Sequence, residues 1–302
     1  MKKIIKLYAL FLVFPIKVAV WFINGIRRLS KGKALEGFAF EFRTRLQNEF
    51  NKIDDRTYII REANDTNVKL TYLDIGSRAG LSPFINKNKA AFQNIILCEG
   101  EPEEVKNLKS QGFLVIDKFL GDQVGPAKFY FIPEHTGASS LKRPGTPFLH
   151  LFSSKHYNLY TKYTEHDITT STLDIELEVL GVKAVDFIKI DVQGSELSVI
   201  KGLTTINPLF WEVEMLPLPT YEDTPYGTQI STELLNKGYI SFRQKDRICK
   251  DGIYIYSNEL YMPDYSTQFG KELIRKNIEK WRTMMELFDA KELANHIETL
   301  IR

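Results

Sequence analysis

The 302-residue sequence predicts an α/β fold built around a mostly parallel β-sheet. From Lys69 onward, short apolar runs that end in Gly, Asp or Glu alternate with stretches of helical spacing, which is the pattern of βαβ units. Two runs, at 72–80 and 186–202, pass from a strand through a glycine turn into a helix, and such turns lie at the ligand-binding edge of a parallel sheet. We therefore expect a Rossmann-like domain over residues 69–260.

The core strands are predicted as short apolar runs bounded by turn residues: Lys69–Ile75, Asn94–Cys98, Leu114–Ile116, Phe187–Asp191 and Leu209–Met215. Lys128–Ile132 is expected as a further, peripheral strand. Helical spacing is present in Pro102–Ser110 and Ser195–Lys201. The stretch Pro133–Tyr163 has no clear period, and long irregular segments of this kind are often binding loops or lids.

A late pair of strands, Tyr239–Phe242 and Gly252–Tyr256, is predicted to form an antiparallel hairpin at the edge of the sheet, around a charged turn from Arg243 to Asp251. Residues 261–302 are expected to be a helical extension. Its apolar positions recur at three- and four-residue steps (Ile274, Ile278, Trp281, Met285 and Phe288), and a second helix is expected to begin near Asp289. This stripe either packs on the domain or binds a partner.

The first thirty residues differ from the rest of the chain. Lysines precede a mostly apolar run from Leu7 to Ile26, which is long enough to cross a bilayer, although Lys17 near its middle costs about 2.5–3.5 kcal/mol there. A membrane span or surface anchor, a core or dimer-packing helix, and a cleaved signal peptide remain as interpretations. We expect membrane contact through residues 1–30. A helical lead-in over 31–68 carries an apolar stripe of Phe38, Phe42, Leu46 and Phe50.

The charge balance argues against a nucleic-acid partner. The chain has 40 Lys and Arg against 38 Asp and Glu, and a net charge of +2 is too small an excess to indicate binding to a phosphate backbone. Its two cysteines, Cys98 and Cys249, have no CxxC spacing, and no cluster has the spacing of metal ligands. We expect no metal ligands and a reducing, cytoplasmic compartment.

The turn after the first strand is the strongest local signal for a ligand. Gly76 lets the backbone turn where a side chain would block a ligand, and Gly80 is expected to allow close approach of the following helix. Asp74 places a carboxylate beside the crevice. We expect Asp74, Gly76, Ser77 and Gly80 to bind a cofactor.

The second strand ends at Glu99, where a nucleoside ribose is held through its hydroxyls. The alternative is that Glu99 is one member of an acidic cluster with Glu101, Glu103 and Glu104. A nicotinamide fingerprint would have glycine where Arg78 stands, and Asp74 would repel its diphosphate. The carboxylate instead favours the cationic methionine end of S-adenosylmethionine.

The run from Asp186 to Gly202 reads as a strand, a tight turn and a short helix. Asp191 lies where the strand meets the crevice, at the ligand edge of the sheet. Gly194 and Ser195 can open the helix and Gly202 can close it. Asp191 is either a functional carboxylate or only a turn residue.

Together these motifs resemble the FkbM family of methyltransferases over roughly residues 69–245. The resemblance is carried by Asp74-Ile75-Gly76, Glu99, Leu120-Gly121, Gly137-Ala138-Ser139-Ser140-Leu141, Asp174, Asp186-Phe187-Ile188-Lys189-Ile190-Asp191, Gly194, Glu196 and Lys201-Gly202. It implies a class I methyltransferase fold, with Asp74, Gly76 and Glu99 around S-adenosylmethionine and Asp191 near the transferred methyl group. It also implies O-methylation, often of a sugar hydroxyl in a polysaccharide, glycolipid or natural product.

Two positions depart from the family. Gln193 stands where Glu is often found, so a catalytic carboxylate is not implied there, and Arg78 replaces a small or amide residue.

A hydroxyl acceptor must lose its proton to a general base or a metal-bound group, while the methyl group requires in-line approach. Asp191 is the predicted catalytic residue; the second choices are Glu212, Glu214, His150 and His156. The expected partner is a carbohydrate or small-molecule acceptor. Two alternatives use the same crevice: a nucleotide-sugar or nicotinamide-dependent oxidoreductase, and a non-catalytic, membrane-tethered cofactor-binding protein.

Overall fold

The computed structural model describes residues 68–78, 80–145, 158, 160–218, 220–250 and 253–301. These residues belong to one unit, which contains both the predicted methyltransferase domain and the C-terminal helices. The predicted membrane-contact segment at 1–30 and all but the last residue of the lead-in at 31–68 lie outside the described residues. Across the described ranges, no helix is long and apolar enough to span a membrane.

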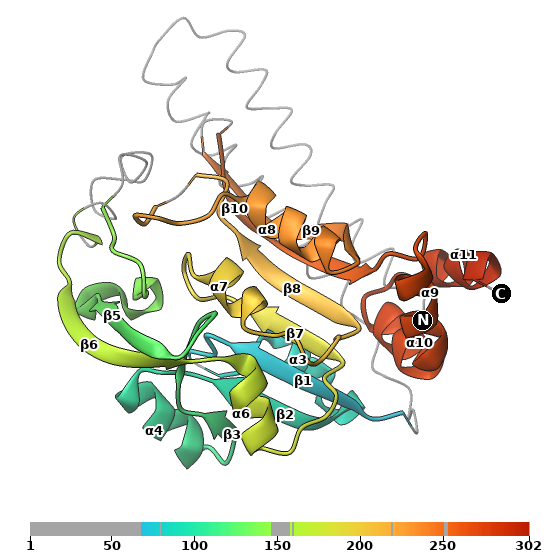
Figure 1. Cartoon of the computed structure of the whole chain (residues 1–302), viewed down its shortest axis with the longest axis horizontal. Helices are drawn as coiled ribbons and strands as arrows, with labels where there is room; N and C mark the ends of the chain where they lie inside the picture. Colours follow the sequence, from blue (N-terminus) through green and yellow to red (C-terminus); the bar gives the residue numbers. More distant parts are fainter. Residues whose placement is uncertain are drawn as a thin grey trace, which may run out of the picture. The chain divides into compact units, whose positions relative to one another are not determined.

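A seven-stranded sheet with the order β3-β2-β1-β7-β8-β10-β9 forms the centre of this unit (Figure 1). Its parallel strands lie within two residues of the predicted bounds: β1 (Leu70–Ile75), β2 (Phe92–Cys98), β3 (Leu114–Ile116), β7 (Phe187–Ile190) and β8 (Phe210–Met215). The antiparallel hairpin of β9 (Tyr239–Lys250) and β10 (Ile253–Pro263) closes one edge. This order is the class I methyltransferase topology that the sequence predicts.

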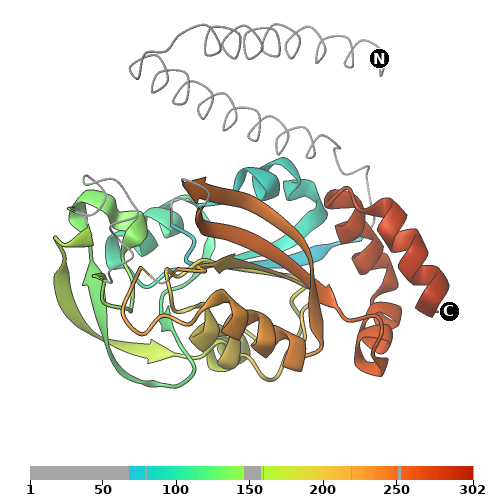
Figure 2. The same ribbon diagram turned by 90° about the horizontal axis from the view of Figure 1, so that it is seen from above.

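Helices cover both faces of the sheet, which explains why its parallel strands are largely buried. Figure 2 shows α7 (Glu196–Lys201) and α8 (Gly227–Asn236) on one side and α3 (Pro83–Lys87) on the other. α4 (Pro102–Ser110) has the predicted bounds, and the Glu101 side chain caps its first turn by accepting from two backbone N–H groups.

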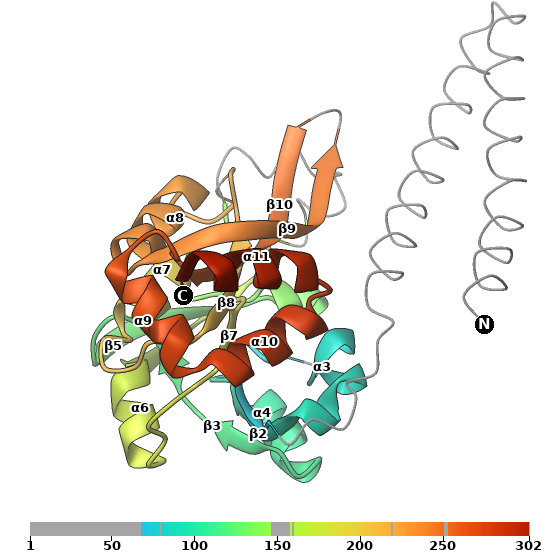
Figure 3. The same ribbon diagram turned by 90° about the vertical axis from the view of Figure 1, so that its right-hand side faces the viewer.

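The edge hairpin is longer than predicted. Arg243 to Lys250 continue β9 instead of forming a charged turn, and β10 runs to Pro263, beyond the predicted domain end at 260. Polar side chains pair across the two strands: the Arg247 guanidinium lies 4.9 Å from the centre of the Tyr254 ring. Such pairs stabilise strands whose charge is typical of turns. Figure 3 shows the far ends of β9 and β10 projecting from the sheet.

A second sheet of three strands has the order β4-β6-β5: β4 (Phe119–Leu120), β5 (Gly125–Phe131) and β6 (Thr164–Ser171). Lys128–Ile132, predicted as a further, peripheral strand, falls in this small sheet, where β5 begins earlier, at Gly125, and ends at Phe131. β6 was not predicted, since it is mostly polar and exposed and lacks an apolar run. The 3-10 helix η2 (Pro133–Ala138) begins the segment predicted to be irregular.

Three helices form the C-terminus, at the end of the unit opposite the small sheet (Figures 1 and 2): α9 (Gln268–Lys276), α10 (Ile278–Leu287) and α11 (Lys291–Ile301). The predicted stripe packs on the domain. Phe288 stacks on Phe84 and meets the edge of Phe187, with ring centroids 5.5 Å apart in both pairs. Lys280 also pairs with buried Asp186, 2.9 Å away, so α10 is anchored to the residue before β7.

Candidate active site

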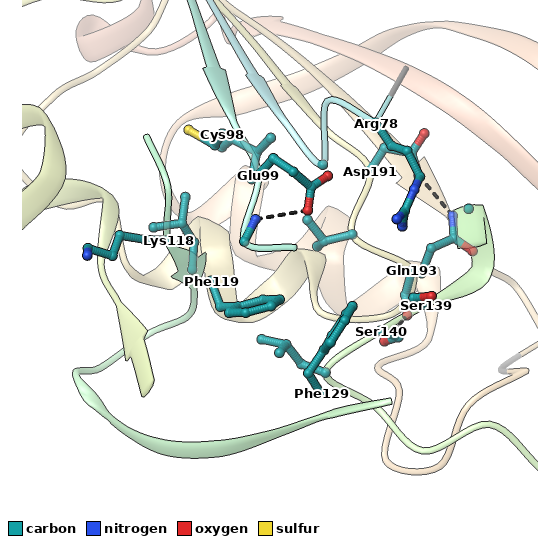
Figure 4. A pocket seen from close by; sticks show the side chains of 17 residues that line it. Arg78, Cys98, Glu99, Lys118, Phe119, Phe129, Ser139, Ser140, Asp191 and Gln193 are labelled. Carbon is teal, nitrogen blue, oxygen red and sulfur yellow. Dashed lines mark hydrogen bonds between the residues drawn. The ribbon is translucent and has the colours of Figure 1, made fainter. Parts of the chain in front are cut away.

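The carboxyl ends of β1, β2 and β7 meet where the strand order reverses, which is the ligand-binding position of an open α/β sheet. Two adjoining cavities open there and share the lining residues Gly76, Arg78, Gly137, Asp191 and Gln193. The first holds about 600 Å³ of space, part of which is open to solvent. It brings Glu99 and Asp191 together with Phe119 and Phe129 (Figure 4). The second contains Asp74, Lys189 and Asp191.

Glu99 follows β2 and has one carboxylate oxygen fixed by the backbone. Its Oε1 accepts hydrogen bonds from the N–H groups of Gly100 and Glu101, both at 2.9 Å. Within the described part of the chain, Oε2 accepts no hydrogen bond. Burial raises the pKa of Glu99, although the Glu101 N–H and the charge of Arg78 oppose it. An oriented carboxylate with one free oxygen at this strand end suits the hydroxyls of a ribose.

Asp74 and Asp191 are joined through Lys189, which belongs to the family motif but was not predicted as a site residue. Lys189 Nζ lies 3.5 Å from Asp74 Oδ1 and 3.2 Å from Asp191 Oδ2. Although burial alone would lower the pKa of Lys189, the nearby carboxylates raise it. Its position carried a signal: in a strand, residues 189 and 191 share one face, and parallel register places Lys189 opposite Asp74.

Asp74 is only 2 % exposed, and burial raises its pKa despite Lys189 and a hydrogen bond from the Tyr72 hydroxyl.

Gln193 contacts the Asp191 carboxylate oxygen that Lys189 does not. Its Nε2 donates to Asp191 Oδ1 at 2.9 Å and to Glu214 Oε2 at 2.8 Å. The Tyr221 hydroxyl lies 3.0 Å from Gln193 Oε1, which fixes the orientation of the amide. The Ser140 hydroxyl donates to the Gln193 carbonyl, so the segment 137–141 is bound to this loop. Where the family often has a carboxylate, this chain has an amide between two carboxylates.

Glu196 organises the loop between β7 and α7. Its carboxylate accepts hydrogen bonds from the backbone N–H groups of Val192 and Gly194. Gln193, between them, has φ of +56°, a conformation that is uncommon for a residue with a side chain. Glu196 therefore supports the loop that presents Asp191, and it lies outside the cavities.

The glycine turn is shaped by its protein neighbours. Gly76 has φ of +81°, and a Cβ there would lie 1.9 Å from the Asp191 carbonyl oxygen, so glycine is required for β1 and β7 to meet. The expected reason for Gly80 is wrong: a Cβ there would contact only the Gln111 side chain at 4.0 Å, and its φ of +84° is what favours glycine. Ser77 is buried, and its hydroxyl donates to the Cys98 carbonyl, holding the turn on β2.

Other signature positions lie away from the crevice and have structural roles. Asp174, in α6 (Leu173–Val179), accepts hydrogen bonds from the backbone N–H and hydroxyl groups of Thr204 and Thr205. These bonds lower its pKa although burial opposes them. A Cβ at Gly202 would lie 2.1 Å from the Gly121 carbonyl oxygen. These positions fasten the chain after α7 to the rest of the domain.

The residues considered as alternative general bases lie in different parts of the structure. Glu214 touches Gln193, and burial together with Asp191 and Glu196 raises its pKa. Glu212 is instead paired with Lys245 at 2.7 Å. His150 and His156 lie outside the described residues. Among the described residues, no group of three or more His, Cys, Asp or Glu side chains could hold a metal ion.

Comparisons with solved structures find distant similarities. The chain is similar to the magnesium protoporphyrin IX methyltransferase (ChlM) of Synechocystis PCC 6803, solved with bound SAM, at 11% sequence identity and a TM-score of 0.35, over 65% of this chain and 71% of that one. It is also similar to M. capricolum TrmK in complex with S-adenosyl-homocysteine, at 10% identity and a TM-score of 0.34, over 82% and 95% of the two chains. Both scores are below 0.5, so the fold assignment rests on the strand order.

No curated protein matches the chain. The family model described as "Methyltransferase FkbM domain" matches residues 74–241, which is more than half of the chain and contains Asp74, Glu99 and Asp191. This match supports a methyltransferase over the nucleotide-sugar or nicotinamide-dependent oxidoreductase. The chain belongs to the FkbM family of S-adenosylmethionine-dependent methyltransferases.

Proposed function

We propose that this methyltransferase methylates a hydroxyl group, most naturally that of a sugar in a polysaccharide, glycolipid or natural product, with Asp191 as the catalytic residue. The observation that carries this proposal is the position of Asp191. It lines both cavities, and its side chain is 30% exposed while Asp74 beside it is buried. A hydroxyl acceptor must lose a proton, and this carboxylate is open to the crevice.

The residues present fit S-adenosylmethionine, which supplies the methyl group when bound. Glu99 would hold the ribose through Oε2, and Phe119 and Phe129 offer apolar rings to the adenine. Asp74 Oδ1 is a buried oxygen without a hydrogen-bond partner among the described residues, which suits the methionine ammonium. Gly76, Ser77 and Gly80 shape the turn beneath it.

We place the acceptor on the side of Asp191 that faces Gln193 and Glu214. Tyr256 is half-buried against the apolar cluster that includes Leu216 and Tyr221, and burial and then the charges of Glu214, Asp246 and Asp191 raise its pKa. A tyrosine combines a ring face with a hydroxyl, and both can contact a sugar.

Incubation with methyl-labelled S-adenosylmethionine and envelope carbohydrate fractions, followed by mass spectrometry, tests the acceptor class. We expect label on a hydroxyl oxygen of a sugar. Asp191→Asn should lose this transfer while it still binds S-adenosyl-homocysteine in calorimetry. Transfer to nitrogen or carbon, or wild-type turnover in Asp191→Asn, would contradict the proposal.

We further propose that the domain works on the cytosolic side, where its cofactor is made, with residues 1–30 touching the membrane there. Protease treatment of sealed vesicles distinguishes this from export, because a cytosolic domain is protected only in right-side-out vesicles.

A further inference from the structure

Of the two cations that line the second cavity, Arg78 and Lys189, Arg78 is the one with the weaker ties to carboxylates. Lys189 is held between Asp74 and Asp191. Arg78 lines both cavities, and its side chain is 20% exposed. Its guanidinium donates to the Thr136 carbonyl at 2.6 Å through Nη1, and its Nη2 lies 3.4 Å from Glu101 Oε2.

The contact with Glu101 is long for a charge pair, since such bonds are usually about 2.7–2.9 Å. Glu101 also caps α4, accepting from the N–H groups of Glu103 and Glu104, so it has partners besides Arg78. Within the described part of the chain, Arg78 Nε donates no hydrogen bond. The guanidinium can therefore bind an anion in the cavity without breaking a short ion pair.

The charges of the second cavity identify that anion. Asp74 Oδ1 accepts no hydrogen bond within the described residues and has Lys189, 3.5 Å away, as its counter-charge, while Lys189 is itself shared between Asp74 and Asp191. The methionine part of the cofactor carries both an ammonium and a carboxylate. A carboxylate entering a cavity that already holds Asp74 and Asp191 requires a cation, and Arg78 is the cation at its wall that is not paired with these two carboxylates.

We propose that Arg78 binds the carboxylate of the methionine part of S-adenosylmethionine through the paired N–H groups of its planar guanidinium. This inference rests on the proposed cofactor site. It gives a binding role to the position at which the chain departs from the small or amide residue of its family.

The test compares two ligands that differ only in the carboxylate: S-adenosylmethionine and its decarboxylated analogue. Calorimetry on the full chain should show that the wild type prefers the carboxylate-bearing ligand by about tenfold to a hundredfold, as expected for a hydrogen-bonded charge pair. Arg78→Ala should abolish this preference and leave the affinity for the decarboxylated ligand within about twofold. Arg78→Lys keeps the positive charge but lacks the paired N–H groups of a guanidinium, so it should keep part of the preference for the carboxylate-bearing ligand.

Lys118→Ala is the matched control, because Lys118 lines the first cavity only. It should change the affinity for both ligands by one common factor. If Arg78→Ala does not fold, which its melting temperature reveals, Arg78→Gln replaces it and should also lose the preference. If the Arg78 variants still prefer S-adenosylmethionine over the decarboxylated ligand, the role of Arg78 is overturned but the cofactor site stands. If the wild type binds neither ligand, both the role of Arg78 and the proposed cofactor site are overturned.

Discussion

Lys189 and Asp74 lie opposite each other on neighbouring parallel strands, with Lys189 Nζ 3.5 Å from Asp74 Oδ1. Because Asp74 is almost fully buried, its negative charge depends on this ammonium and on the Tyr72 hydroxyl. The pair is therefore part of the core as well as of the cavity wall.

Replacing Lys189 with Met should lower the free energy of unfolding by about 3 kcal/mol, because a buried carboxylate then loses its counter-charge. Urea denaturation at neutral pH measures this. The double variant with Asp74→Asn removes the stranded charge and should recover more than half of the loss. A single variant as stable as the wild type would contradict the pairing.

Gln193→Glu should destabilise the protein more at pH 8 than at pH 5. It replaces an amide donor by a third carboxylate between Asp191 and Glu214, and like charges repel unless one takes up a proton. We expect a loss of about 1–3 kcal/mol at the higher pH. Gln193→Ala removes the amide without adding charge, so its loss should vary less with pH. Equal pH dependence in both variants would argue against the amide bridge.

Glu196 should make stability fall as pH rises. Burial, opposed by the Gly194 and Val192 N–H groups, raises its pKa to about 7. The unfolded chain has a pKa of about 4.3 there, so the native state alone holds the proton between these values. This stabilisation is complete below about pH 4.3 and is lost as the pH rises through 7, a change of roughly 4 kcal/mol. Glu196→Gln should remove this part of the pH dependence of the free energy of unfolding, which denaturation at a series of pH values measures. An unchanged pH dependence would contradict the raised pKa of Glu196.

Gly76→Ala should cost far more stability than Gly112→Ala. The two glycines have nearly equal φ values, +81° and +85°, so the backbone strain of alanine, about 1–2 kcal/mol, is common to both. Only at Gly76 would the new Cβ meet the Asp191 carbonyl, whereas the space at Gly112 is open. Thermal melting of both variants isolates the steric part. Similar melting temperatures would show that β1 and β7 can separate freely.

Lys280→Ala should lower the free energy of unfolding by about 2 kcal/mol, because buried Asp186 loses a charged hydrogen-bond donor. Lys291→Ala, which removes an exposed pair with Glu286, is the control and should cost under about 1 kcal/mol. Chemical denaturation compares them, and equal effects would mean that α10 is not anchored at Asp186.

Much of the fold could be predicted because apolar runs and glycine turns are local signals. The five parallel strands are of this kind. The small sheet could not be predicted from local signals, because β6 is stabilised by backbone pairing with β4 and β5 and carries few apolar residues. The hairpin was underestimated for a related reason: the charge of Arg243 to Lys250 is offset by cross-strand contacts that depend on the partner strand.

The candidate site was predictable where one residue marks one strand end, as Asp74, Glu99 and Asp191 do. Lys189 and Gln193 were missed as site residues because their roles depend on neighbours across the sheet. Likewise, the need for glycine at Gly76 comes from the Asp191 carbonyl, which no local pattern of the first turn reveals.

The place of β7 between β1 and β8 has a consequence for how the chain folds. The Thr71 N–H donates to Asp186, 115 residues further along the chain, so the middle strand of the sheet arrives late during synthesis. Until it docks, β1 presents an open, apolar edge that can pair with other chains. Truncated or stalled products that end before residue 187 should therefore aggregate.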